Sequence, residues 1–341
     1  MAKKRRKLCK VKRDVDRLGL SLSPSRELDI AAIARVAREA ESLGYESMWI
    51  PETWGVDAVS VLAALAVSTS RIRLASGIFS VFSRSPVLIA QTAATLQELS
   101  GNRFILGLGA SGPAVVERWH GVPFSSPIER SRLYVEIIRL ALSGSRVDYR
   151  KHGFDLSGFT LSNPPSVAVP VYIAAIGPNN VRLCGELADG WLPIFVARGR
   201  MQVFFDSLSD GAAGANRDLA DVDVAAFVPG LVAERSDELL RRQLAYYIGG
   251  MGTFYYTFVK RMGFAAEAHK VRQLWSSGGR RLAVAAVPQQ LLDLCTLGGE
   301  AEAARQRLDL LREDGVRLPI VTFPHGSTEA EISHTLNVLA P

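Results

Sequence analysis

The sequence predicts an α/β fold, a (β/α)8 TIM barrel with a helical insertion between its seventh and eighth strands. Short apolar runs, which suit strands buried on both faces, alternate with segments of helical spacing, and eight such strand–helix units can be counted. No run is shorter and more polar than the others, as the edge strand of an open sheet would be. A length of 341 residues and a hydrophobic content of 48% suffice for one large core.

Four strand–helix units are expected in the N-terminal part of the chain. Apolar runs predict the strands, and apolar residues that recur at helical spacing predict the helices. Gly44 suits the position just after the first helix, where the left-handed conformation is common. The expected strands are 18–22, 47–50, 72–78 and 103–108, and the expected helices are 29–43, 58–66, 86–99 and 128–142.

The other four units follow a small hairpin that we expect at 147–149 and 159–161. Their expected strands are 169–175, 190–193, 222–227 and 318–323, and their expected helices are 180–187, 201–209, 301–312 and 329–339. Residues 235–298, between the last two strands, show helical spacing and no obvious strand. We therefore predict a helical insertion there and a single domain over residues 17–341.

One glycine-rich segment, RFILGLGASG at 103–112, places a turn directly after the fourth strand. Glycines at this end let a ligand approach the main chain closely, and Pro113 fits the first turn of a following helix. The free amides at such a helix start can bind an anion. The spacing of Gly107, Gly109 and Gly112 also matches a Rossmann dinucleotide loop, but that loop belongs in the first strand–helix unit. Here three units precede it, so we rank the Rossmann interpretation second.

Positive charge is concentrated at the N-terminus. Residues 1–17 hold nine Lys or Arg and two Asp, whereas the net charge of the whole chain is +6, so the remainder is nearly neutral. We expect residues 1–16 to be a basic disordered tail, and we expect no nucleic-acid partner. No run of apolar residues is long enough to span a membrane, and no apolar segment follows the basic stretch as in a secretory signal.

The cysteines and histidines give no sign of a metal site. Cys9, Cys184 and Cys295 lie far apart, and the five histidines are equally scattered. This usage suits a reducing cytoplasm rather than a disulfide framework, so we expect a cytoplasmic protein.

Several longer segments resemble the luciferase-like flavin and deazaflavin oxidoreductases. The resemblance is to the branch that depends on coenzyme F420, which includes the methylenetetrahydromethanopterin reductases, and it covers residues 18–325. The most specific stretches for this family are LSGNRFILGLGASGP and GELADGWLP, which lie within two of the longer segments. The segments are PVLIAQTAATLQELSGNRFILGLGASGP, VVERWHGVPF, VYIAAIGPNNVRLCGELADGWLP, YYIGGMG, RMGF and AVPQQLLDLCTLGGEAEAARQRLDLLREDGV.

The resemblance implies a barrel that binds a deazaflavin across the carboxyl ends of its strands, usually as a homodimer. The chain's own pattern places the turns at 109–112 and 177–180 at strand ends before helices, where amides can face an anion. The alternative is that these glycines only make tight turns. The implied cofactor-binding residues are Gly77, Ile78, Gly109, Ala110, Ser111, Gly112, Ala175, Ile176, Gly177, Asn179 and Asn180.

Two further strand ends are singled out. Gly77–Ile78 matches the family position of a non-proline cis peptide that supports the central ring, the alternative being an ordinary trans strand end. Glu52 follows the second strand where the family often has an acid and then His, but Thr53 stands in place of the His. We take Glu52 as the candidate catalytic residue, either a proton donor or a hydrogen-bond partner of the ring, with helix capping as the alternative.

The aromatic residues near these ends have two interpretations each. Trp54 can wall the ring or be buried in the core, and His120 in the WHG motif fits a packed or surface residue better than a substrate contact. The segment 254–258 can form a substrate lid or a dimer seam. Cys184 is expected in the core.

The predicted function is hydride transfer between C5 of F420 and a small organic substrate with a C=C, C=N or carbonyl group. The alternatives are an FMN-dependent monooxygenase on the same barrel, and a catalytically silent ligand-binding barrel. The sequence names neither the substrate nor the direction of the reaction.

Overall fold

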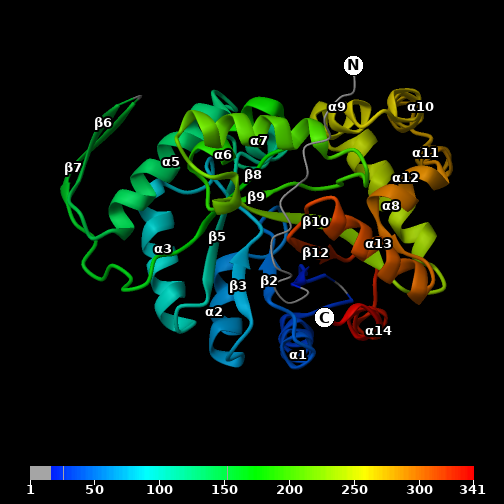
Figure 1. Cartoon of the computed structure of the whole chain (residues 1–341), viewed down its shortest axis with the longest axis horizontal. Coiled ribbons are helices and arrows are strands. Elements are labelled where there is room, and N and C mark those ends of the chain that lie inside the picture. The colour runs from blue at the N-terminus through cyan, green and yellow to red at the C-terminus, as the bar shows by residue number, and fades with distance from the viewer. Residues whose placement is uncertain (1–16, 26, 152) are drawn as a thin grey trace, which may run out of the picture.

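The computed structural model describes residues 17–25, 27–151 and 153–341, so the expected tail at 1–16 lies outside the described part. Within it the chain folds as a closed parallel barrel surrounded by helices (Figure 1). This confirms the predicted TIM barrel. The barrel strands are β1 (Gly19–Ser21), β2 (Ser47–Ile50), β3 (Arg73–Ser76), β5 (Phe104–Gly109), β8 (Val171–Ala174), β9 (Gly190–Leu192), β10 (Asp223–Leu231) and β12 (Leu318–Thr322).

The strands close on themselves in chain order. β1 pairs in parallel with both β2 and β12, with Gly19 opposite Ser47 on one side and Ile320 on the other. On the far side β9 pairs with β8 and β10. All carboxyl ends therefore lie on one rim, where a barrel builds its site.

The outer helices begin where the sequence supplies caps. The side chains of Asp29, Asp57 and Ser85 accept hydrogen bonds from the first turns of α1, α2 and α3, and Thr328 and Glu331 form a capping box. The helices around the barrel are α1 (Ile30–Ser42), α2 (Ala58–Ser68), α3 (Pro86–Leu99), α4 (Pro113–Arg118), α5 (Pro127–Leu142), α6 (Pro178–Leu187), α7 (Gln202–Gly214), the 3₁₀ turn η1 (Leu219–Asp221), α13 (Ala301–Glu313) and α14 (Glu329–Leu339).

The helical insertion lies between β10 and β12, as predicted, but it contains one strand that the sequence did not reveal. β11 (Leu297–Gly298) pairs in parallel with the last two residues of β10. It forms because β10 is longer than the other barrel strands and runs past the rim, and a pair of residues has no period to detect. The helices of the insertion are α8 (Ser236–Gly250), α9 (Thr253–Arg261), α10 (Ala265–Ser276), α11 (Arg280–Ala285) and α12 (Gln289–Cys295).

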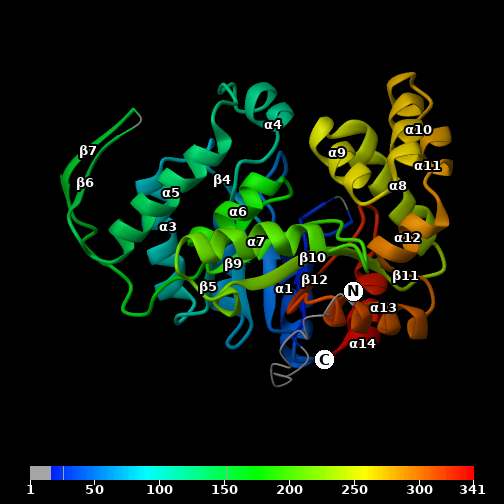
Figure 2. The same ribbon diagram turned by 45° about the horizontal axis from the view of Figure 1, so that its top comes forward.

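The predicted hairpin is present, with its second strand earlier than expected. β6 (Val147–Lys151) pairs with β7 (Phe154–Phe159), whereas we predicted the return strand at 159–161. Gly153, with φ of 83°, takes part in the reversal between them. The hairpin projects from the body beside α3 and α5 (Figures 1 and 2).

The barrel interior is a compact aromatic cluster. The ring of Trp49 lies 5.8 Å from that of Tyr172 and 5.7 Å from that of Phe227, measured between centroids. Below it, at the amino ends of the strands, Arg17 bridges the carboxylates of Glu46 and Asp223. The interior is thus filled and its lower end is tied by ion pairs, which leaves the upper rim for binding.

Candidate functional site

The third barrel strand is interrupted at Gly77 and Ile78, the residues singled out for the cofactor ring. β3 ends at Ser76, the Gly77–Ile78 peptide is cis, and β4 (Phe79–Ser80) resumes pairing at the far end of β5. The predicted non-proline cis peptide is therefore confirmed. The expectation of one continuous strand over 72–78 is wrong, because pairing with β5 is interrupted at 77–78, while the Gly77 N–H still donates to the Ile50 carbonyl at 2.8 Å.

Two glycines of β5 make room for this segment. A Cβ on Gly107 would lie 2.0 Å from the carbonyl oxygen of Ser76, and one on Gly109 would lie 2.5 Å from Cδ1 of Ile78. The Ser76 hydroxyl also accepts a hydrogen bond from the Gly107 N–H and donates one to its carbonyl, both at 2.9 Å. The first two glycines of the G-x-G-x-x-G pattern thus serve strand packing, which a Rossmann loop does not require of them.

The turn after β5 is open toward solvent. Gly112 caps α4 without a side-chain hydrogen bond, and a Cβ there would meet nothing within 4 Å. Ala110 is buried, whereas Ser111 is exposed with φ of 59°. α4 has only six residues, so the field at its start is weaker than we expected from the sequence.

The turn after β8 carries the stronger anion-binding features. Gly177 caps the ten-residue α6 without a side-chain hydrogen bond, and the space beside its Cα is open. Asn180, in the first turn, has a buried Oδ1 without a hydrogen-bond partner. Before the turn, Ala175 is fixed because its carbonyl accepts a hydrogen bond from Trp191 Nε1 at 2.8 Å. Ile176 is half-buried and Asn179 is exposed.

The two turns are neighbours because β5 and β8 pair directly, with Leu106 opposite Val171. α6 is held close to α7, since a Cβ on Gly185 would lie 2.1 Å from a carbonyl oxygen of α7. The structure therefore brings together the predicted positions 77–78, 109–112 and 175–180 on one side of the rim.

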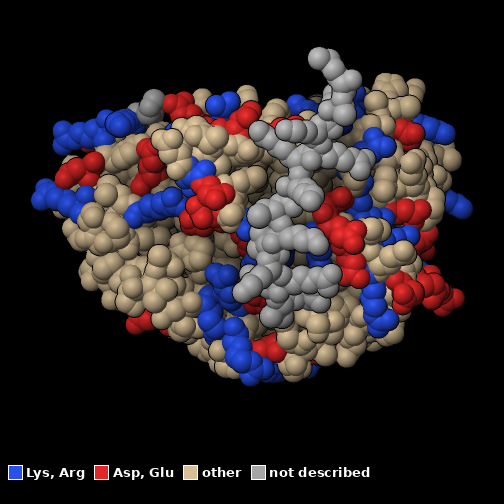
Figure 3. All heavy atoms as spheres, in the orientation of Figure 1, with Lys and Arg blue, Asp and Glu red and all other residues tan. Residues whose placement is uncertain are grey.

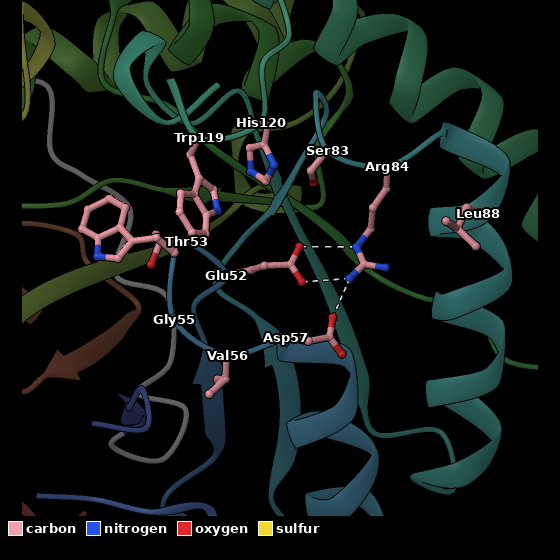
Figure 4. Close-up of a pocket in the computed structure, with 11 residues that line it drawn as sticks. Glu52, Thr53, Gly55, Val56, Asp57, Ser83, Arg84, Leu88, Trp119 and His120 are labelled. Atoms are coloured by element: carbon pink, nitrogen blue, oxygen red, sulfur yellow. Dashed lines mark hydrogen bonds and ion pairs between the residues drawn. The ribbon is translucent and has the colours of Figure 1, made fainter. Parts of the chain in front are cut away.

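The predicted catalytic residue Glu52 lies in a separate cavity of about 390 Å³ beside the ends of β2 and β4 (Figure 4). Arg84 donates to both carboxylate oxygens, at 2.9 and 3.3 Å, and also reaches Asp57 at 2.7 Å. The hydrogen bond to Glu52, opposed by burial, raises the pKa of Arg84. Burial alone would raise the pKa of Asp57, but hydrogen bonds from Ser60 and Arg84 outweigh it and lower that pKa.

The sequence did not point to Arg84, although its charge completes the site. The position of Arg84 in the loop after β4 was the one available signal. Its ion-pair partner Glu52 lies 32 residues away in the sequence, so spacing did not connect the two. The same cavity is lined by Trp54, Trp119 and His120. Trp54 is 47% exposed, so it is a cavity wall and not a core residue, and His120 is exposed at the surface.

A larger cavity of about 1150 Å³ separates the rim from the insertion. Its barrel side is formed by the loops after β1, β2 and β12, and its other side by α8, the end of α10 and α11. Thr53, Trp54 and Gly55 line both cavities. The loop that carries Glu52 therefore separates the two.

The aromatic segment 254–258 packs within the chain. Phe258 is buried against Phe204, at 5.0 Å between ring centroids, and Phe254 lies 6.2 Å from Phe124. α9 and α4 rise on opposite sides above the strand ends (Figure 2), and Phe124 follows α4. The contact between Phe124 and Phe254 bridges the two sides while Phe254 stays 44% exposed, so the lid and the dimer seam both stay predictions.

The remaining chemistry-bearing groups lie outside the site. Cys184 is buried in α6, as predicted, and burial raises the pKa of its thiol; burial also raises the pKa of Cys295 to about 12. In the described part of the chain, no three His, Cys, Asp or Glu side chains are grouped to hold a metal ion. None of the helices described has the length and apolarity to cross a bilayer. On the face seen in Figure 3, acidic and basic side chains are interspersed outside the grey area.

Comparison with known proteins agrees with this architecture. A protein of Mycobacterium tuberculosis, named as a candidate coenzyme F420-dependent oxidoreductase, is 32% identical over 87% of this chain and 91% of its own length. The 5,10-methylenetetrahydromethanopterin reductase of Archaeoglobus fulgidus is 28% identical over 84% of this chain and 88% of its own length.

Solved structures share the fold. The F420-dependent tetrahydromethanopterin reductase of Methanopyrus kandleri superposes with a TM-score of 0.78 at 24% identity, covering 95% of this chain and 97% of that one. An F420-dependent secondary alcohol dehydrogenase gives the same TM-score at 17% identity, covering 95% and 99%. The model of the luciferase-like monooxygenases matches residues 16–318. The chain therefore belongs to the luciferase-like monooxygenase family.

Proposed function

We propose that this protein is a coenzyme F420-dependent oxidoreductase, which moves a hydride between C5 of the deazaflavin and a C=C, C=N or carbonyl carbon of a small organic substrate. The relative from Mycobacterium tuberculosis and the two solved structures support the cofactor, since their names specify F420. The observation that carries the proposal is the open turn before α6, where the amides at the helix start and the unpartnered Asn180 Oδ1 lie beside Gly77–Ile78 and the end of β5.

The residues present fit such a cofactor. A helix start without a side-chain cap offers N–H groups to a phosphodiester, and a buried carbonyl oxygen without a donor favours a ligand hydroxyl. The turns at 109–112 and 175–180 would hold the anionic side of the molecule, with Gly77 and Ile78 against its ring. When bound, the deazaflavin supplies the two-electron chemistry at C5.

The chain's own residues supply position, shielding and a proton site. The half-buried Ile78 offers an apolar surface, and Gly109 leaves the space that its side chain occupies. Trp54 and Trp119 line the cavity that holds Glu52 and give it an apolar wall. We assign to Glu52 the exchange of the proton that accompanies hydride transfer, with Arg84 holding its carboxylate in place.

The experiment that tests the proposal compares the binding and turnover of F420, a deazaflavin, with those of FMN, a flavin, on the purified chain. We expect F420 to bind, reduced F420 to be oxidised by at least one member of a panel of enones, imines and ketones, and oxygen uptake to be absent. Tight binding of FMN with oxygen uptake would establish the monooxygenase instead. Binding of F420 without turnover of any acceptor would leave a ligand-binding barrel.

The remaining expectations concern assembly and location. We propose a homodimer in the cytoplasm with a small-molecule substrate. Light scattering on the purified protein tests the assembly, and a mass of one chain at micromolar concentration would contradict it.

A further inference from the structure

The larger cavity has an excess of positive charge. Arg242 of α8 and Arg280 and Arg281 of α11 line it, and Glu238 is the one carboxylate among its lining residues. Within residues 17–25, 27–151 and 153–341, neither Arg242 nor Arg281 forms an ion pair. Their charges therefore face the cavity and solvent, where an anionic ligand would meet them.

An aromatic wall stands beside these arginines. The ring of Trp275 lies 5.9 Å from that of Tyr246, which lies 5.7 Å from that of Tyr247. Arg280 is placed over Trp275, with its guanidinium carbon 5.5 Å from the ring centroid. All three aromatic residues line the cavity, so a planar or apolar molecule has a fixed surface to pack against.

The wall depends on two glycines of the segment YYIGGMG. A Cβ on Gly249 would lie 2.6 Å from the side chain of Trp275, and one on Gly250 would lie 3.1 Å from it. α8 therefore carries glycine at the two positions where Trp275 must approach its backbone.

A further polar group in the same cavity lacks a partner. Gln243 lines it between Arg242 and the aromatic residues of α8, and its Oε1 is buried without a hydrogen bond. An unpaired buried oxygen is unfavourable, so a ligand that donates a hydrogen bond there gains by satisfying it.

The opposite wall connects the cavity to the proposed chemistry. Pro51, Thr53 and Trp54 flank Glu52 in sequence and line the cavity on the barrel side. A ligand anchored on the insertion therefore meets the rim at the loop that carries Glu52, whose side chain lines the smaller cavity on the other side of that loop.

We propose that the larger cavity is the substrate site and that the substrate is an organic acid, a carboxylate or a phosphate monoester, with a planar or apolar body and a hydrogen-bond donor. Arg242 and Arg281 hold the anionic group, Tyr246 and Trp275 pack against the body, and Gln243 accepts from the donor. The proposal rests on the proposed function for the reaction, whereas the binding of acids can be measured separately. A cavity of about 1150 Å³ is large enough for a molecule of this kind.

The test is a titration of the full chain loaded with F420, followed by tryptophan fluorescence, because Trp54 and Trp275 line the cavity. The probes are trans-cinnamate, phenyl phosphate and the neutral cinnamamide. The test variant combines R242Q with R281Q. The control variant is R261Q, because Arg261 is exposed on α9 and lies outside the cavity. We expect at least one acidic probe to bind, the combined variant to weaken it about tenfold or more, and R261Q to leave it unchanged. Preference for cinnamate or for phenyl phosphate distinguishes the two kinds of anion.

Three results would overturn the proposal. These are binding of the amide as tight as that of the acids, absence of binding by both acids, and equal affinity of the wild type and the combined variant for the acids. Weaker F420 binding by the combined variant would assign the arginines to the cofactor, which also overturns it. Failure of the proposed function is distinct, because the wild type would then not bind F420 while the same acid titrations on the unloaded chain still give their answer.

Discussion

Glu52 and Arg84 form a two-pronged hydrogen-bonded ion pair at the barrel rim, with 2.9 and 3.3 Å between the guanidinium nitrogens and the two carboxylate oxygens (Figure 4). Asp57 binds the same guanidinium but lies at the start of α2, where it caps the helix. Glu52 also accepts a hydrogen bond from the Ala58 N–H at 3.4 Å, which is the helix-start contact offered as the alternative to a catalytic role. Because Asp57 shares both the Arg84 partner and the contact with the start of α2, it is the matched control for Glu52.

We predict that Glu52→Gln lowers kcat about 100-fold or more, because the proton site is lost while the size of the side chain is kept. Asp57→Asn should leave kcat within about threefold, since asparagine also caps a helix start. Steady-state kinetics with reduced F420 and the best acceptor of the panel measure both. A Glu52→Gln enzyme with wild-type kcat and an unchanged pH profile would remove Glu52 from the mechanism.

The glycines of β5 give a second pair of predictions. In Gly109→Ala the new Cβ meets the end of the Ile78 side chain at 2.5 Å, so Ile78 must move and F420 affinity should fall about tenfold with the fold retained. In Gly107→Ala the Cβ meets a backbone oxygen at 2.0 Å, and the free energy of unfolding should fall by about 3 kcal/mol or more. Denaturant unfolding and F420 titration separate the two effects. Equal stability of the two variants would contradict this account.

The ion pairs below the barrel predict a stability effect far from the site. Arg17→Met removes the partner shared by Glu46 and Asp223, and partial exposure of these groups reduces the loss to about 2 kcal/mol. F420 affinity should not change, because the pair lies at the amino ends of the strands. A variant as stable as the wild type would contradict this, and would show that Arg73 and Arg317 suffice as ion-pair partners of Glu46 and Asp223.

A pH-dependent contribution is expected from Glu41, which ties the end of α1 to the segment before β3. Burial acts to raise its pKa, but hydrogen bonds from the N–H groups of Arg71, Ile72 and Ser70 lower it from 4.5 to about 2. A lowered pKa in the folded state stabilises the fold above pH 4.5, and this contribution is lost as the pH falls toward 2. Glu41→Gln should therefore cost about 1 kcal/mol at pH 7, after allowance for solvent screening, and progressively less below pH 4.5. The free energies of unfolding of the wild type and Glu41→Gln, measured at pH 7 and pH 3, test this prediction. A cost of the substitution that is larger at pH 3 than at pH 7 would contradict it.

The fold could be predicted from the sequence because each barrel strand is a separate apolar run and the glycine turns mark the rim. The 77–78 peptide was placed by family resemblance, and local pattern alone would have continued the strand. β11 could not be predicted, since two residues carry no periodicity and its pairing depends on how far β10 extends. The ion pair of Glu52 with Arg84 and the cavity under the insertion depend on contacts between distant segments, which spacing along the chain does not encode.

The central claim is that the turn before α6 holds the anionic part of F420, and the most direct measurement is the dissociation constant of F420 for Gly177→Val beside the wild type. Gly214→Val is the matched control, because this glycine lies at the end of α7 and also has room for a Cβ. We predict that Gly177→Val weakens F420 binding about tenfold or more with little change in thermal stability, since its side chain would fill the open space beside the helix start. Gly214→Val should bind as the wild type does. A folded Gly177→Val protein with wild-type affinity for F420 would contradict the claim.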